Sequence, residues 1–231
     1  MRWWVTDWLD AAGPVFLVSW ITWVVVSIVL HELAHGWMAL RCGDDTPRYT
    51  GHMTANPFVH IPVPWAWVMF ALFGFTWGLM PVNPANFRGR YDDTKVAFAG
   101  PLMNLILAVF CLVADAAWLT FATNVQDPLH LNLHKFLWIG LMINLMGFCF
   151  NLLPVPPLDG SRIASDLIPA YNRMLYKIQT SEGGAIVAMI AFTVLFMAGG
   201  RVVWPFVMTV AAISSGGLTA IMGGTFRDPF A

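Results

Sequence analysis

The stretch AAGPVFLVSWITWVVVSIVLHELAH, residues 11–35, decides the fold of this chain. Residues 11–30 contain no charged side chain. At about 1.5 Å of rise per residue, a helix over this run would be about 30 Å long, which matches one bilayer hydrocarbon core. The pattern therefore predicts a membrane-spanning helix whose last third carries three polar side chains, those of His31, Glu32 and His35.

The composition also indicates a membrane protein. Of the 231 residues, 58% are hydrophobic and 11% are charged, against about 25% charged in soluble domains. The net charge of −1 and the lack of a basic run argue against nucleic acid as a partner. No sequence feature indicates an oligomeric state.

Five further apolar runs follow, over residues 64–80, 96–122, 136–153, 184–198 and 202–222. The run at 64–80 is interrupted by Gly74 and Gly78 and closed by Pro81, so a continuous helix cannot pass through its end. The run at 202–222 either spans the membrane or lies at its surface. The pattern predicts an all-α polytopic membrane protein with about five to six transmembrane helices.

Several polar residues lie between or within these runs. His52, His130 and His134 fall outside the runs and are expected in solvated loops. Asp115 lies about 30 Å along a helix from Lys95 and is expected to reach the opposite membrane interface. His60 is expected to be structural or to line a cavity.

Residues 31–35 read His-Glu-Leu-Ala-His, an HExxH motif. Positions i and i+4 of a helix share a face, so both imidazoles can reach one metal ion, and Glu32 can act as general base toward a metal-bound water. A charged group inside a transmembrane helix costs roughly 2.5–3.5 kcal/mol on insertion scales, which favours a functional role. The alternative is a pair of histidines that pack against neighbouring helices.

A catalytic zinc site needs three protein ligands and one open position. Asp159 follows the run at 136–153 and is preceded by three prolines, Pro154, Pro156 and Pro157. Non-helical backbone at membrane depth is tolerated only where it lines an enclosed or watery cavity. Asp-Gly is equally a common turn pair, so the residues alone leave metal ligand and turn as equal alternatives for Asp159.

Together, these motifs resemble the signatures of the site-2 protease family of intramembrane metalloproteases. The family shows HExxH on one transmembrane helix and NxxPxPxLDG on a later one, matched here by residues 31–35 and 151–160. Residues 99–104, AGPLMN, are similar to the family's GPxxN segment, and residues 81–88 resemble the loop of short prokaryotic members. The resemblance covers roughly residues 20–170.

The resemblance implies one zinc ion held by His31, His35 and Asp159, with Glu32 activating the water. Asn151 matches the residue thought to orient substrate or steady the oxyanion; alternatively, its amide pairs with free carbonyls at a helix end. The expected activity is hydrolysis of transmembrane protein substrates in the bilayer. The alternative is a non-proteolytic metal-binding pseudoenzyme or an escort of transmembrane segments.

The resemblance further implies a single membrane-embedded metalloprotease domain over residues 1–231. Its three-helix catalytic core lies at about 14–170, and C-terminal helices fall within 184–222. Nothing in the chain matches the PDZ or CBS domains that many members carry.

The expected ligands also impose a topology. His35 lies near the end of the first span and Asp159 follows the run at 136–153, so these two segments must cross the membrane in the same direction. Only one full crossing can separate them, which makes residues 96–122 the span and residues 64–80 a re-entrant loop. One face of the membrane then collects nine Lys and Arg residues: Arg41, Arg48, Arg88, Arg90, Lys95, Arg162, Arg173, Lys177 and Arg227. By the positive-inside rule, the active site of this multi-pass cell-membrane protein opens toward the cytoplasm.

Overall fold

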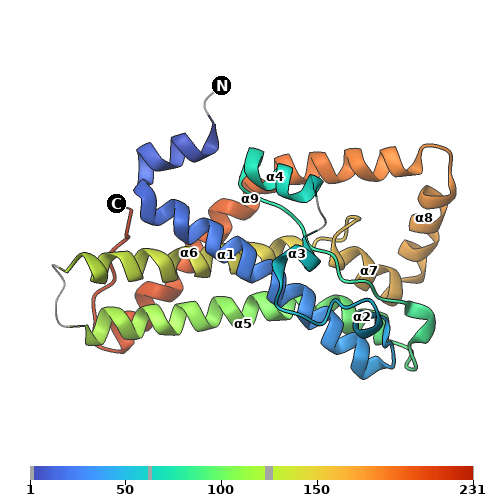
Figure 1. Cartoon of the computed structure of the whole chain (residues 1–231), viewed down its shortest axis with the longest axis horizontal. Helices are drawn as coiled ribbons and strands as arrows, with labels where there is room; N and C mark the ends of the chain where they lie inside the picture. Colours follow the sequence, from blue (N-terminus) through green and yellow to red (C-terminus); the bar gives the residue numbers. More distant parts are fainter. Residues whose placement is uncertain (1–2, 62–63, 123–126, 231) are drawn as a thin grey trace.

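The computed structural model describes residues 3–61, 64–122 and 127–230, and the elements in these ranges are helical (Figure 1). Four helices are long and apolar enough to cross a membrane, within α1, α5, α6 and α9. Helices α1, α5 and α6 contact one another, and α7 packs against α5. The helices are α1 (Trp4–Cys42), α2 (Thr46–Tyr49), α3 (Pro57–His60), α4 (Trp65–Phe73), α5 (Asp92–Phe121), α6 (Pro128–Asn151), α7 (Asp159–Leu167), α8 (Pro169–Thr180) and α9 (Gly184–Ile221), with the 3₁₀ turn η1 (Pro84–Asn86) before α5.

Helix α1 is bent near its start and closed by a glycine. Gly13 has φ 83° and ψ 175°, a conformation open essentially to glycine alone, and Pro14 behind it has no N–H to donate. The chain before the bend turns away from the rest of α1 (Figure 1). At the other end Gly43, with φ 100°, forms a left-handed cap whose N–H bonds the carbonyls of the last turn.

Residues 64–80 form the expected re-entrant loop. Helix α4 has nine residues, about 13 Å of helix, which is too short to cross a bilayer. At the tip of the loop, the indole N–H of Trp20 donates to the Gly74 carbonyl (2.6 Å) and that of Trp4 donates to the Ala71 carbonyl (2.9 Å). At its base, the Asp44 carboxylate accepts from the Asn83 N–H at 2.7 Å, so the chain returns to the end of α1 that it left.

Helix α6 begins eight residues earlier than the apolar run at 136–153, and this corrects the expectation of solvated histidines. The Asp127 carboxylate caps the helix by accepting from the Leu129 N–H, and Pro128 supplies the first turn. His130 and His134 are therefore buried on α6. Asp115 is also buried in the protein, where its carboxylate bonds His134 Nδ1 at 2.7 Å; its depth in the membrane stays a prediction.

The last two apolar runs, expected as separate segments, lie on the single helix α9 of 38 residues. The residues after α9 consequently lie at the end of the molecule where α6 begins, because His134 Nε2 donates to the Arg227 carbonyl at 2.8 Å. Arg227 therefore does not belong to the face on which the sequence placed it. The other eight lie in the last turn of α1, on α2, between η1 and the first turn of α5, or on α7 and α8, so they are still expected on one face.

Candidate zinc site

Three metal-binding side chains from two helices meet at one point. His31 and His35 come from one face of α1, and Asp159 comes from the first turn of α7. Asp159 Oδ2 lies 3.2 Å from His31 Nε2 and 3.3 Å from His35 Nε2, and the two Nε2 atoms are 3.0 Å apart. Both histidines are buried. The structure therefore brings together the three residues that the sequence selected.

The donor set and its spacing fit zinc. Zinc in proteins takes imidazole nitrogen and carboxylate oxygen at about 2.0–2.2 Å in a tetrahedron, which puts neighbouring donors about 3.3–3.5 Å apart. The three donor–donor distances here come within a few tenths of an ångström of that spacing. Gly100 leaves the space free, because a Cβ at this position would lie 2.5 Å from His31 Nε2 and closer still to His35 Nε2.

Each histidine is fixed by a partner on its other ring nitrogen. His35 Nδ1 lies 2.6 Å from the Val96 carbonyl, and because a carbonyl only accepts, Nδ1 carries the proton and Nε2 is left with a free lone pair. His31 Nδ1 lies 2.6 Å from Asn104 Oδ1. Such partners orient metal-binding histidines and raise their basicity.

The orientation of Asn104 follows from a chain of bonds. The Gly140 carbonyl can only accept, so the Asn144 group 2.8 Å from it is Nδ2, and Asn144 Oδ1 then faces Asn104 Nδ2 at 3.2 Å. Asn104 Nδ2 also donates to Ser27 Oγ. This leaves Asn104 Oδ1 as the acceptor for His31. Asn104 thus links α5 to α1 and α6, and the sequence did not reveal its contact with His31.

Asp159 is positioned by the contacts of α7 with α5. Arg162 forms an ion pair with Asp93 at 2.5 Å, and Asp166 accepts from the side-chain hydroxyl and the backbone N–H of Thr94. The Gly160 that suggested a turn has another role, because a Cβ there would lie 2.5 Å from the Leu153 carbonyl and closer to that of Leu152. Only glycine lets α7 start this close to the preceding backbone.

Glu32 lies against the re-entrant loop. Its side chain is buried, and a Cβ added to Gly78 would lie 2.5 Å from Glu32 Cγ. The loop thus needs glycine here to pass over the carboxylate, which the sequence did not reveal. Leu79 next to it donates its N–H to the His60 carbonyl at 2.8 Å.

Three other polar residues singled out in the sequence, Asn151, His60 and His52, form hydrogen bonds to backbone carbonyls. Asn151 ends α6, and its Nδ2 donates to the Gly147 carbonyl at 3.1 Å, which is the helix-end pairing held open as an alternative. His60 is fully buried, with Nε2 2.6 Å from the Thr54 carbonyl. His52 bonds within its own turn, to Thr50.

Comparison with known proteins agrees with this geometry. The model of peptidase family M50 matches residues 19–127 and 119–198. The protein described as "Putative zinc metalloprotease YwhC" of Bacillus subtilis is 37% identical over 186 residues, which are 79% of this chain and 82% of that protein. The "Putative zinc metalloprotease Rip2" of Mycobacterium tuberculosis is 29% identical over 176 residues, 71% of this chain and 63% of that protein. No solved structure matches the chain. The chain belongs to peptidase family M50, the site-2 protease family that its two motifs predict.

Proposed function

We propose that this metalloprotease hydrolyses peptide bonds of transmembrane protein substrates within or at the edge of the bilayer. The observation that carries the proposal is a triad of donor atoms on helices of a membrane protein, from two buried histidines and the half-buried Asp159, 3.0–3.3 Å from one another. A soluble protease has no need to place such polar groups on an apolar span, where they are costly.

The proposed ligands are His31, His35 and Asp159. When bound there, zinc supplies Lewis acidity, lowering the pKa of water toward about 7 and polarising the scissile carbonyl. Glu32 accepts the proton of the attacking water and later delivers it to the leaving amine. Because its carboxylate lies against Gly78, the re-entrant loop limits the space around this base.

Asn151 is proposed as a substrate-orienting or oxyanion-stabilising residue. Its position at the end of α6, before the loop that leads to Asp159, supports the role. The bond of Nδ2 to Gly147 leaves the second N–H of the amide available as a donor. The substrate must unfold locally to present a peptide bond, since helical backbone is already hydrogen-bonded.

We propose that the site opens toward the cytoplasm and that the chain forms a single membrane-embedded domain with its catalytic core at about 14–170. Eight basic residues on the face of the zinc site support this orientation by the positive-inside rule. Single cysteines at the exposed positions Tyr49 and Arg90, in a background without the three native cysteines, test it against Leu129 at the other end. We expect the first two to be labelled from the cytoplasm and Leu129→Cys from outside; labelling of the first two from opposite sides would contradict the re-entrant loop.

The central test compares Glu32→Gln with Glu182→Gln, a matched change at an exposed position outside the site. Both should bind zinc like wild type, but only Glu32→Gln should lose cleavage of a transmembrane reporter, by about 10²–10⁴-fold. Zinc content by mass spectrometry and cleavage in proteoliposomes are measured on the same preparations. Near-normal cleavage by Glu32→Gln would refute the assigned base, and zinc binding without cleavage by wild type on any transmembrane reporter would favour the escort alternative.

A further inference from the structure

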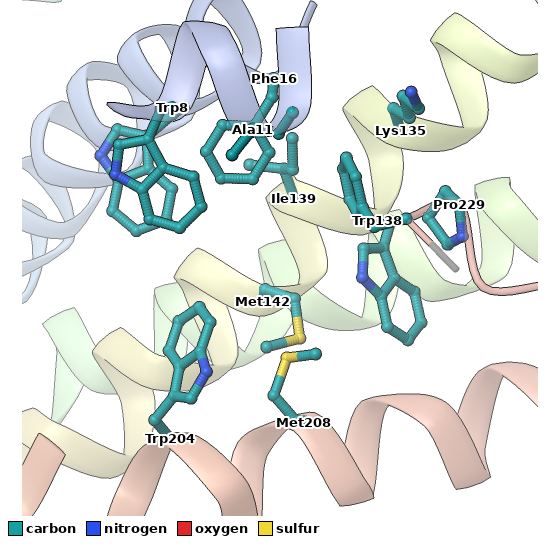
Figure 2. A pocket seen from close by; sticks show the side chains of 13 residues that line it. Trp8, Ala11, Phe16, Lys135, Trp138, Ile139, Met142, Trp204, Met208 and Pro229 are labelled. Carbon is teal, nitrogen blue, oxygen red and sulfur yellow. The ribbon is translucent and has the colours of Figure 1, made fainter. Parts of the chain in front are cut away.

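A second site lies at the end of the molecule opposite the zinc site. It is a crevice of about 460 Å³ between α1, α6, α9 and the residues after α9 (Figure 2). Of the α1 residues that line the crevice, Trp20 is the nearest in sequence to His31. His31 follows eleven residues later, about 16 Å along the helix. The crevice is thus separate from the catalytic centre, whose residues do not line it.

The walls of the crevice are aromatic and thioether side chains. Trp138 and Met142 of α6 face Trp204 and Met208 of α9, and Trp8 and Phe16 of α1 close a third side (Figure 2). The volume falls in the range of about 300–1,000 Å³ typical of small-molecule sites. Between helices in a bilayer, walls of this kind fit an apolar chain.

One charged side chain lines the crevice, that of Lys135. It is half-buried, and its ammonium lies 5.3 Å from the centre of the Phe230 ring. Within the described ranges, no carboxylate forms an ion pair with it. Lys135 lies seven residues into α6, about 10 Å from the helix start, a depth from which lysine reaches the headgroup layer.

We propose that this crevice binds an anionic phospholipid, with an acyl chain between the Trp and Met side chains and the phosphate on Lys135. Two observations carry it: apolar walls on three helices, and a rim cation that has no ion-pair partner among the described residues and lies about 10 Å from the start of α6. A zwitterionic lipid would fill the same walls but would carry its own cation close to Lys135. The site should therefore prefer a lipid with net negative charge.

The test is native mass spectrometry of the zinc-loaded protein titrated with palmitoyl-oleoyl phosphatidylglycerol or the matching phosphatidylcholine. We expect wild type to retain phosphatidylglycerol about fivefold better, the effect of one lysine near a membrane surface. Lys135→Gln should remove this preference, and Lys177→Gln, an exposed cation on α8, should keep it. Ala11→Trp, at an exposed position that lines the crevice, should weaken retention of both lipids.

Zinc content measured on each variant verifies the fold independently of lipid and of proteolysis. Equal retention of the two lipids by wild type, or an unchanged preference in Lys135→Gln, would overturn the proposal. A photo-crosslinking residue at position 208 distinguishes the occupant: adducts with lipid support the proposal, whereas adducts with membrane proteins alone would refute it.

Discussion

Gly100→Ala tests the zinc site by filling it. The added Cβ would lie 2.5 Å from His31 Nε2 and closer to His35 Nε2, whereas carbon and nitrogen in contact prefer about 3.5 Å. Each imidazole must therefore retreat by about 1 Å, roughly five times the 0.2 Å tolerance of a metal–ligand distance. We expect zinc affinity to fall by at least about 100-fold, the upper end of what losing an outer-shell partner costs.

The matched control is Gly217→Ala on α9, where an added Cβ meets nothing within 4 Å. Glycine to alanine in a helix interior stabilises by about 1 kcal/mol in both variants before any clash, so helix propensity does not distinguish them. Zinc affinity is measured by competition with a chromogenic chelator, and folding by thermal unfolding without metal. A Gly100→Ala protein that binds zinc as tightly as the Gly217→Ala control would refute the placement of zinc between the two histidines.

Three further outcomes are expected. Asn104→Ala should weaken zinc binding about 10–100-fold without removing a ligand, because His31 loses its orienting acceptor; unchanged affinity in the chelator assay would exclude that role. Asp159→Ala should abolish zinc binding at limiting metal. Asp166→Ala should keep the zinc and lose about 1 kcal/mol of stability, because it removes the two hydrogen bonds from Thr94 of α5. Equal zinc stoichiometry in wild type and Asp159→Ala would show that Asp159 is not a ligand. Asp44→Asn should destabilise the protein above about pH 4 and progressively less below it. Burial raises the pKa of Asp44, but the hydrogen bonds from Thr46, Asn83 and Asn86 outweigh burial and lower this pKa below 3.8. The stability that the Asp44 carboxylate confers is therefore lost as the pH falls through its pKa in the folded protein. Thermal unfolding of wild type and Asp44→Asn from pH 7 to pH 3 measures the loss, and a stability difference between them that does not change with pH would contradict the prediction.

Of the three proposed ligands, the two histidines follow from a local signal, and Asp159 follows from the resemblance to the site-2 protease motif. His31 and His35 share a helix face by the 3.6-residue period, and Asp159 is marked by the prolines that keep its approach non-helical. What the residues left open was whether Asp159 is a ligand or part of a turn. That choice depends on the contact of α7 with α5, between residues about 70 positions apart, such as Asp93 and Arg162. No local pattern encodes such a separation.

Other features were missed because hydropathy was the only guide. The first two turns of α6 contain polar residues, so the run seemed to start at residue 136, although Asp127-Pro128 is a recognisable cap signal. Gly199, Gly200 and Arg201 seemed to divide two segments, yet α9 continues through them. Each glycine inside a helix costs about 1 kcal/mol, which packing against other helices can offset. The hydropathy pattern of the sequence does not show whether such packing exists.

The Trp20 bond to the Gly74 carbonyl and the Asp44 bond to Asn83 attach the re-entrant loop to α1 at both its tip and its base. The loop is therefore held to α1 on both sides of Gly78, the residue that passes over the Glu32 carboxylate. Asp159 reaches the proposed zinc site from α7, which is fastened to α5. Because His31 and His35 bond Asn104 and Val96 of the same α5, all three proposed donors are tied to one helix, and a bound ion would add a direct link between groups that α5 already holds together.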